Sequence, residues 1–138
     1  MKLVIFGGGS SYTPELIQGV IDSYEILPVQ EVALTDINPR RLGVLAGLSQ
    51  RMVAKASLPI RVTSTTDRRR ALGGATFVNS IIRVGGMAAR IQDERIPLKY
   101  GVIGQETTGP GGMMKALRTI PVILDLARDM VDLCPDAW

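Results

Sequence analysis

A glycine-rich loop close to the N-terminus carries the first chemical signal in the sequence. Gly7, Gly8 and Gly9 follow a short apolar run, and the segment Ser10–Thr13 then leads into Pro14. Glycines allow a tight turn and a close approach to a pyrophosphate, whose charge the free N–H groups of a helix start stabilise. Gly7 and Gly9 fit the G-x-G-x-x-G fingerprint, but Tyr12 stands at its third glycine. The alternative is a glycine turn that binds no ligand.

Asp36 strengthens the dinucleotide interpretation. An acidic residue at the end of the second strand binds the ribose hydroxyls of NAD in such folds. Its carboxylate repels the extra phosphate of NADP, although Arg40 and Arg41 follow closely and could accommodate one. The alternative role for Asp36 is that of a turn or cap residue before Asn38.

Two arginines and a glutamate form a second group of polar residues. Arg83 and Arg90 follow the fourth predicted strand, where loops line the ligand crevice and arginine suits a bidentate grip on phosphate or carboxylate. Glu106, in a glycine-dense loop, could act as a general base or modulate one; otherwise it is a solvated loop residue. Asn79, inside the fourth strand, could touch the cofactor with its amide. The alternative for the arginines is surface salt bridging with nearby acids, namely Asp93, Glu94 and Glu106.

The composition excludes several classes of site. The 138 residues contain no histidine and a single cysteine, Cys134, so an intrachain disulfide, a self-contained zinc site and a Ser-His-Asp or Cys-His arrangement are all excluded. The N-terminal apolar run is too short for a signal peptide or a membrane span, which predicts a cytoplasmic protein. The net charge of +3 arises largely from Arg68–Arg70. Because no aromatic residues are interleaved with these arginines, we expect a solvated turn and no nucleic-acid interface.

Strand and helix signals alternate over the first 82 residues. Helices are predicted to start at Thr13, as N-cap before Pro14, and near Pro39, and Asp67–Leu72 can only be a short helix or turn. The predicted strands are Leu3–Phe6, Glu31–Thr35, Ile60–Thr65 and Ala75–Ile82. The alternation predicts an α/β fold with a Rossmann-like, doubly wound parallel sheet.

Two helices are predicted in residues 83–138. A short one is expected over Met87–Glu94, ended by Pro97, and a long one over Met113–Leu133, kinked or broken at Pro121. The residues expected on the inward face of the long helix are Leu117, Ile120, Leu124, Ala127 and Val131. Another strand is expected to start at Trp138, so residues 1–138 are predicted to form an NAD-binding domain truncated before its last strands.

Five segments resemble glycoside hydrolase family 4, and within it the 6-phospho-β-glucosidases. They are Gly7–Pro14, Arg83–Arg90, Ile96–Thr107, Gly109–Gly112 and Cys134–Trp138, of which the third is the most specific. The resemblance implies hydrolysis of a phosphorylated disaccharide or glucoside by oxidation, elimination, addition and reduction, an exception to the usual pair of carboxylates. NAD would carry the redox step, and a divalent metal such as manganese would act as Lewis acid in the full-length protein.

The resemblance also implies roles for individual residues. Arg90 matches a substrate-binding arginine, and Glu106 matches the glutamate that tunes the basicity of a catalytic tyrosine. The positions that match the cofactor site are Gly7, Gly9, Ser10, Tyr12, Thr13, Asp36, Asn79 and Arg83. The metal ligands, the acid and the tyrosine base have no counterpart in this chain, so the chain alone is expected to bind no metal and hydrolyse no glycoside.

Two other functions fit the residues taken alone. One is a malate- or lactate-type dehydrogenase, against which the segment Gln105–Thr107 argues. The other is a non-catalytic NAD-binding module, against which Arg90 and Glu106 argue. For the full-length protein we expect a homo-oligomer that contacts neither nucleic acid nor membrane.

Overall fold

The chain forms two compact units. The computed structural model describes residues 1–138, with Met1–Ile82 and Asp129–Trp138 in the first unit and Arg83–Arg128 in the second. The glycine loop and Asp36 therefore belong to the first unit, and Arg83, Arg90 and Glu106 to the second.

The first unit is built on a four-stranded parallel sheet. Its strands are β1 (Lys2–Phe6), β2 (Glu31–Thr35), β3 (Arg61–Thr65) and β4 (Phe77–Ser80), in the order β3-β2-β1-β4. The predicted parallel sheet is confirmed, although β4 is shorter than the apolar run suggested. In a parallel sheet all strands end at one edge, so the segments that follow β1, β2 and β4 leave from the same side.

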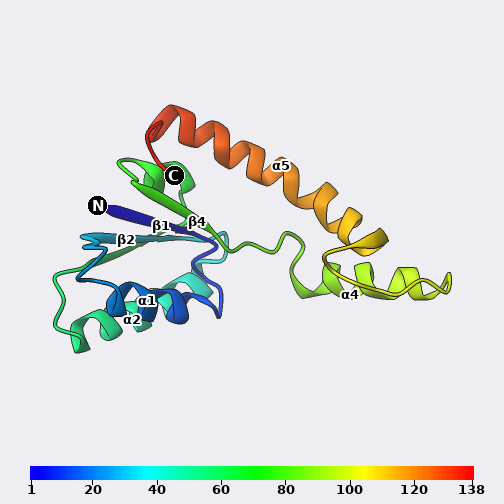
Figure 1. The fold of residues 1–138 in the computed structure, drawn as a ribbon, viewed down its shortest axis with the longest axis horizontal. Helices are drawn as coiled ribbons and strands as arrows, with labels where there is room; N and C mark the ends of the chain where they lie inside the picture. Colours follow the sequence, from blue (N-terminus) through cyan, green and yellow to red (C-terminus); the bar gives the residue numbers. More distant parts are fainter. The chain divides into compact units, whose positions relative to one another are not determined.

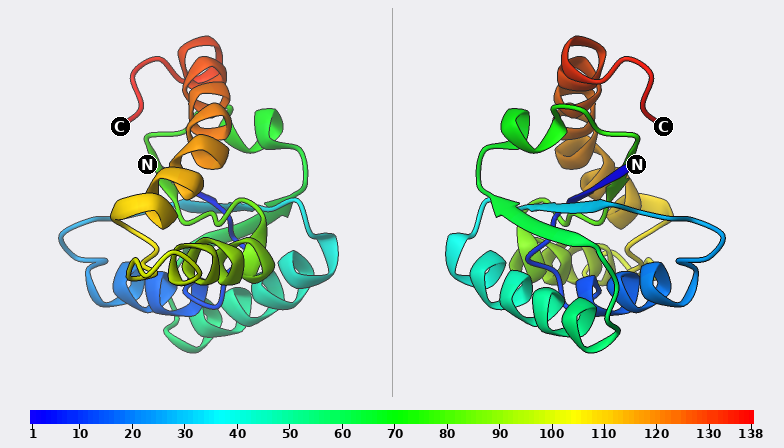
Figure 2. Two further views of the ribbon diagram at one scale, coloured as in Figure 1. Left: turned by 90° about the vertical axis from the view of Figure 1, so that its right-hand side faces the viewer. Right: turned by 90° about the vertical axis from the view of Figure 1, so that its left-hand side faces the viewer.

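Helices cover both faces of this sheet. α1 (Thr13–Asp22) and α2 (Pro39–Lys55) lie on one face, below the sheet in Figure 1, and Figure 2 shows the short α3 (Arg68–Leu72) on the other. The core under α1 and α2 contains Ile5 and Leu34, which are neighbours in register on β1 and β2 and are fully buried. The doubly wound arrangement predicted from the alternation is thus confirmed.

Thr13 does not cap α1 as predicted. Tyr12 occupies the N-cap position and makes no side-chain cap bond, while Thr13 is the first helical residue. The Thr13 side chain is fully buried, and its hydroxyl donates to the Gly8 carbonyl oxygen at 2.9 Å. The hydroxyl bonds to a loop carbonyl because a buried polar group, removed from water, needs a hydrogen-bond partner within the protein.

The second unit contains α4 (Gly86–Leu98) and most of α5 (Gly109–Leu133). Pro97 was predicted to end the first of these helices, but it lies inside the last turn. A proline there removes only the bond to the Asp93 carbonyl, and the N–H groups of Lys99, Tyr100 and Val102 close the helix end on the carbonyls of Ile96 and Pro97.

α5 runs through Pro121 without the break that was one of the two expected outcomes there. The missing bond would go to the carbonyl of the exposed Leu117, which water can reach. The predicted inward stripe is exposed instead: Leu117, Ile120, Leu124, Ala127 and Val131. The buried residues in the last third of α5 are Leu126 and Asp129. None of the helices has the length and apolar character needed to cross a membrane.

The C-terminal segment of the first unit lies along β4. Trp138 donates its backbone N–H to the Thr76 carbonyl at 3.0 Å and accepts from the Val78 N–H at 2.7 Å. This is the pattern of a parallel bridge, so the backbone at Trp138 pairs as a strand at the edge of the sheet.

A cluster of charges joins α3 to the end of α5. The buried Asp129 accepts from Arg68 at 2.6 Å and also from Arg69, while Asp67 caps α3 by accepting from the Arg70 N–H. Arg68 and Arg69 therefore lie in a short helix and pair with Asp129, where a solvated turn was expected, although Arg69 itself remains exposed. Burial raises the pKa of Asp129, but the hydrogen bonds from Arg68 and Arg69 outweigh it and the pKa lies below its ordinary value.

We expect the Asp129 cluster to stabilise the chain in a pH-dependent way. A carboxylate whose pKa is lowered by folding adds stability above its unfolded pKa of about 4, and this stability is lost as the pH falls through the folded value. Asp129→Asn should therefore lower the thermal midpoint at pH 7, and its difference from the parent chain should vanish on acidification.

A control on the same helix separates this effect from the loss of any one carboxylate. Asp125 pairs only with Arg128 at an exposed site, so Asp125→Asn should hardly change the midpoint at either pH. Equal losses for the two variants would contradict a stabilising role of the cluster.

Candidate functional site

The glycine loop is tied to the end of β2. The N–H groups of Gly7 and Gly8 both donate to the Thr35 carbonyl oxygen, at 2.8 and 2.9 Å. Gly7 has a φ of +98°, and a Cβ on Gly8 would lie 2.8 Å from the Cβ of Leu34. Only glycine therefore fits these two positions, because the loop must turn sharply while touching its neighbouring strand.

Asp36 lies directly against the loop. Its Oδ2 accepts from the Gly9 N–H at 2.9 Å, and its Oδ1 accepts from the Asn38 N–H at 2.8 Å. A Cβ on Gly9 would lie 2.8 Å from Asp36 Oδ2, so this glycine is required by the carboxylate. Asp36 therefore does stabilise the turn before Asn38, the alternative role that the sequence suggested. Since a carboxylate has about four acceptor positions, the same group retains capacity for the hydroxyls of a ribose.

The other predicted cofactor residues fall into two groups. Ser10, Tyr12, Arg41 and Asn79 are partly or fully exposed, and Tyr12 retains 65% of its accessible surface. Thr13 is buried, so its side chain shapes the loop from behind and does not reach a ligand.

The loop has the features of a pyrophosphate cradle. A side chain on Gly7, Gly8 or Gly9 would collide with the chain, so the backbone itself forms the surface. No side chain caps the N-terminus of α1, which leaves the positive end of its helix dipole for an anion, although Pro14 has no N–H and the Thr13 N–H is donated to the Ser10 carbonyl oxygen at 3.1 Å. These residues fit a dinucleotide.

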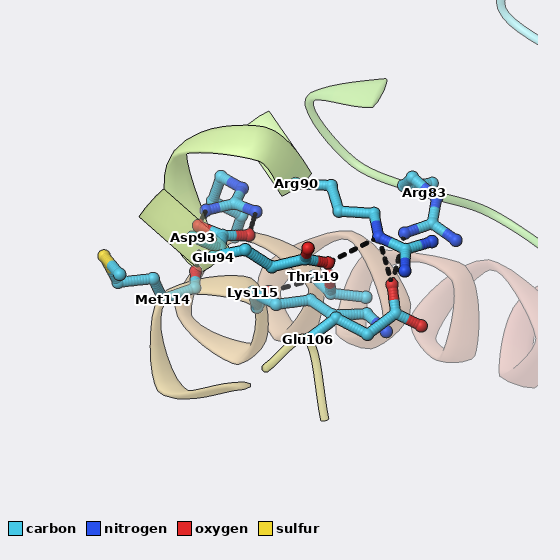
Figure 3. Close-up of polar contacts among 9 residues, drawn as sticks. Arg83, Arg90, Asp93, Glu94, Glu106, Met114, Lys115 and Thr119 are labelled. Carbon is cyan, nitrogen blue, oxygen red and sulfur yellow. Dashed lines mark hydrogen bonds and ion pairs between the residues drawn. The ribbon is translucent and has the colours of Figure 1, made fainter. Parts of the chain in front are cut away.

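Ion pairs link three predicted site residues in the second unit, namely Arg83 (cofactor), Arg90 (substrate) and Glu106 (catalysis). Arg83 Nη1 donates to Glu106 Oε2 at 2.7 Å, and Arg90 Nε lies 3.0 Å from the same oxygen (Figure 3). Arg90 Nε also donates to Glu94 Oε1 at 2.7 Å, whereas the terminal amino groups of Arg90 make no hydrogen bond. The salt bridges considered for these arginines therefore exist, and they still leave the bidentate fork of Arg90 available to an anion.

Glu106 is held in its charged form. The hydrogen bond from Arg83 lowers the pKa of Glu106, partial burial opposes it, and the positive charges of Arg83, Arg90 and Lys115 add to the lowering. Glu106 and Lys115 also line a shallow hollow of about 310 Å³ together with Thr107 and Thr119. An ionised Glu106 can accept a proton or a hydrogen bond at this hollow, but it cannot donate one.

Asp93 and Arg118 form a second ion pair that the sequence did not reveal. Both carboxylate oxygens of Asp93 accept from Arg118, at 2.9 and 2.5 Å, and these bonds lower the pKa of Asp93 against its burial. The pair joins α4 to α5 across 25 residues, a separation for which sequence spacing carries no signal. Asp93 is therefore not a partner of Arg83 or Arg90.

The structure contains no group of three or more His, Cys, Asp or Glu side chains placed to hold a metal ion. The one cysteine, Cys134, is buried.

Curated relatives match the whole chain. It is 57% identical over 140 residues to a probable 6-phospho-β-glucosidase of Bacillus subtilis, and 51% identical over 140 residues to a 6-phospho-β-glucosidase of Escherichia coli. Both alignments cover 100% of this chain but only 32% and 31% of the relative. The chain thus spans about a third of the length of the curated relatives that it matches.

Solved structures agree with the sequence comparison. A 6-phospho-β-glucosidase from Thermotoga maritima, solved with manganese, NAD⁺ and glucose 6-phosphate, superposes with a TM-score of 0.91 at 37% identity, over 96% of this chain and 33% of that one. A 6-phospho-α-glucosidase from gut microorganisms, in complex with NAD and Mn²⁺, gives a TM-score of 0.94 at 30% identity, over 99% and 31%.

A family model decides between the glycosidase and the dehydrogenase interpretations. The model is described as Family 4 glycosyl hydrolase and matches residues 2–138. The glycine loop, Asp36, Arg90 and Glu106 all lie inside the matched range. The chain belongs to glycosyl hydrolase family 4.

Proposed function

We propose that the chain is the NAD-binding part of an NAD- and divalent-metal-dependent 6-phospho-β-glucosidase. The single observation that carries the proposal is the contact of Asp36 with the glycine loop, at 2.9 Å from the Gly9 N–H, in a chain of this family. The Bacillus subtilis and Escherichia coli relatives named above support the β-linked, phosphorylated substrate class, since both are described as 6-phospho-β-glucosidases, the first as a probable one.

The cofactor residues have separate tasks in this proposal. The N–H groups of Gly7–Gly9 are donated to Thr35 and Asp36, so this loop lets the pyrophosphate approach closely while the start of α1 stabilises its charge, and Asp36 accepts from the ribose hydroxyls. Bound NAD would take up a hydride from the sugar and return it later. Asp36 favours NAD over NADP because its charge repels a ribose phosphate, whereas Arg41, an exposed residue in the first turn of α2, adds only a local positive charge.

The substrate residues act through charge. The free fork of Arg90 suits a phosphate or a sugar hydroxyl, and Arg83 and Arg90 keep Glu106 ionised. An ionised Glu106 stabilises a neighbouring group that must accept and release a proton, as the family resemblance implies for the tyrosine base. We propose that the tyrosine, the acid and the metal ligands belong to polypeptide that the relatives carry outside the matched third.

Three statements about the whole protein stay predictions from the sequence: a cytoplasmic location, a homo-oligomeric state, and the absence of nucleic-acid and membrane partners. Size-exclusion chromatography with light scattering on the whole protein would test the second.

The cofactor proposal predicts that the chain binds NAD. Calorimetric titration should give saturable binding of NAD with a dissociation constant in the millimolar range or below, and NADP should bind more weakly because of Asp36. No heat of binding at millimolar NAD would overturn the proposal for this chain.

Asp36→Ala should weaken NAD binding about tenfold or more, since a hydrogen bond to a charged group contributes about 1.5–3 kcal/mol. The same substitution should reduce the preference for NAD over NADP. The matched control is Asp22→Ala, which removes a carboxylate at the far end of α1 that bonds only Gln18, and should leave affinity unchanged. Circular dichroism of both variants shows whether the fold is retained.

Arg83→Gln should raise the pKa of Glu106 toward its ordinary value, because the strongest hydrogen bond to the carboxylate is lost. The measurement is a ¹³C NMR titration of the Glu106 side-chain carboxyl. Arg95→Gln removes an exposed charge on α4 that has no acidic partner, and should leave the titration midpoint in place. Identical midpoints in all three proteins would contradict the role given to Arg83.

A further inference from the structure

Two close backbone contacts pack the loop that carries Glu106 against α4. A Cβ on Gly104 would collide with the carbonyl group of Glu94, and a Cβ on Gly111 would lie 2.8 Å from the carbonyl oxygen of Asp93. Only glycine permits two backbones to approach so closely. The loop thus touches one turn of α4 on both sides of Glu106 in the chain, so the position of the Glu106 carboxylate depends on where that turn lies.

Arg118 of α5 holds the same turn of α4. Its two terminal amino groups donate to the two carboxylate oxygens of Asp93, and Nη1 also donates to the Met114 carbonyl oxygen of its own helix at 3.1 Å. The Asp93 side chain is only 4% exposed. A planar guanidinium that binds both oxygens of a buried carboxylate fixes their orientation as well as their distance. The pair therefore sets where this turn lies relative to the start of α5.

Arg118 also lies beside the start of α4. A Cβ on Gly85, the N-cap residue of α4, would lie 3.4 Å from Arg118 Nε and 3.8 Å from its Cδ. The buried Nε has no hydrogen-bond partner, a cost in free energy that the bonds to Asp93 must outweigh. One side chain of α5 thus contacts α4 at its N-cap and again about two turns later.

The charged residues of the candidate site branch from these contact points. Arg83 lies two residues before the N-cap of α4, and Arg90 lies about one turn before Asp93. Both arginines reach Glu106 Oε2, at 2.7 and 3.0 Å (Figure 3). Neither Asp93 nor Arg118 hydrogen-bonds Glu106, and neither is among the charges that shift its pKa. Any effect of the Asp93–Arg118 pair on Glu106 must therefore pass through the placement of the two arginines and the loop.

We propose that Arg118 is a positioning residue for this site: by binding Asp93 it holds α4 against the loop that carries Glu106. Arg83 and Arg90 then meet the Glu106 carboxylate at hydrogen-bonding distance. This role rests on the proposed function, because an ionised Glu106 has a task only in a family 4 substrate site. Arg118 itself acts through the other two arginines.

Two single substitutions distinguish positioning from a direct effect of charge. Asp93→Asn removes a negative charge, which by itself would lower the pKa of Glu106, and Arg118→Gln removes a positive charge, which would raise it. If the pair positions the arginines, both substitutions should raise the pKa of Glu106, by about one unit, which is the scale on which a neighbouring arginine acts. The measurement is a ¹³C NMR titration of the Glu106 carboxyl in the chain. A lowered or unchanged midpoint for Asp93→Asn would overturn the proposal.

Three further variants test whether the two residues act as one pair. The double variant Asp93→Asn with Arg118→Gln should shift the midpoint no further than either single change, since both break the same contact. Arg118→Lys keeps the charge without the planar fork, so its midpoint should lie between those of the parent chain and Arg118→Gln. Arg128→Gln is the matched control on α5, because Arg128 pairs only with Asp125, and it should leave the midpoint in place. Additive shifts in the double variant, or a shift in the control, would contradict the proposal.

Folding and cofactor binding are followed separately. Circular dichroism of every variant should match that of the parent chain, and a loss of helix would give the pair a purely structural role and overturn the proposal. A midpoint shifted by Arg83→Gln but not by Asp93→Asn would contradict the role of Arg118 alone. A failure to bind NAD would contradict the proposed cofactor function instead, because the Glu106 titration is carried out without NAD.

Discussion

One carbonyl oxygen, that of Thr35, ties the cofactor loop to the sheet. It accepts from the N–H groups of both Gly7 and Gly8, so the turn after β1 is fastened to the end of β2. This contact brings Gly9 against Asp36 and leaves no room for a side chain on Gly8 or Gly9. The position of Asp36, the acid that we propose binds the ribose, thus follows from the parallel pairing of two strands and from a loop without side chains.

The second unit is organised by charge more than by apolar packing. Arg118 fastens Asp93 of α4 to α5, and Arg83 and Arg90 converge on Glu106. Partly exposed ion pairs of this kind fix the positions and the protonation states of their side chains, but they contribute little free energy of folding. The unit that carries Arg83, Arg90 and Glu106 therefore has defined polar contacts and little apolar packing of its own.

The sequence predicted the first unit well because its signals are local. Glycines beside an apolar run, and apolar runs alternating with helical patterns, are dictated by backbone sterics and burial over a few residues. The faces of α5 were predicted wrongly for a related reason. The row Leu117, Ile120 and Leu124 has the periodicity of a buried face. Such periodicity identifies an apolar face, but it does not show which surface, if any, packs against that face. In this chain that row is exposed.

The residues by themselves determined the parallel sheet, the glycine loop after β1, the acid at the end of β2 and the absence of a histidine-based metal site. Each follows from residue type and short-range spacing. Only the tertiary structure decided that Thr13 supports the loop from behind, that Asp129 binds two arginines of α3, and that Asp93 pairs with Arg118 while Glu106 takes Arg83 and Arg90. These partners lie 5 to 61 residues apart in the chain, and which of several nearby charges meet depends on how the elements pack, since opposite charges attract without regard to sequence.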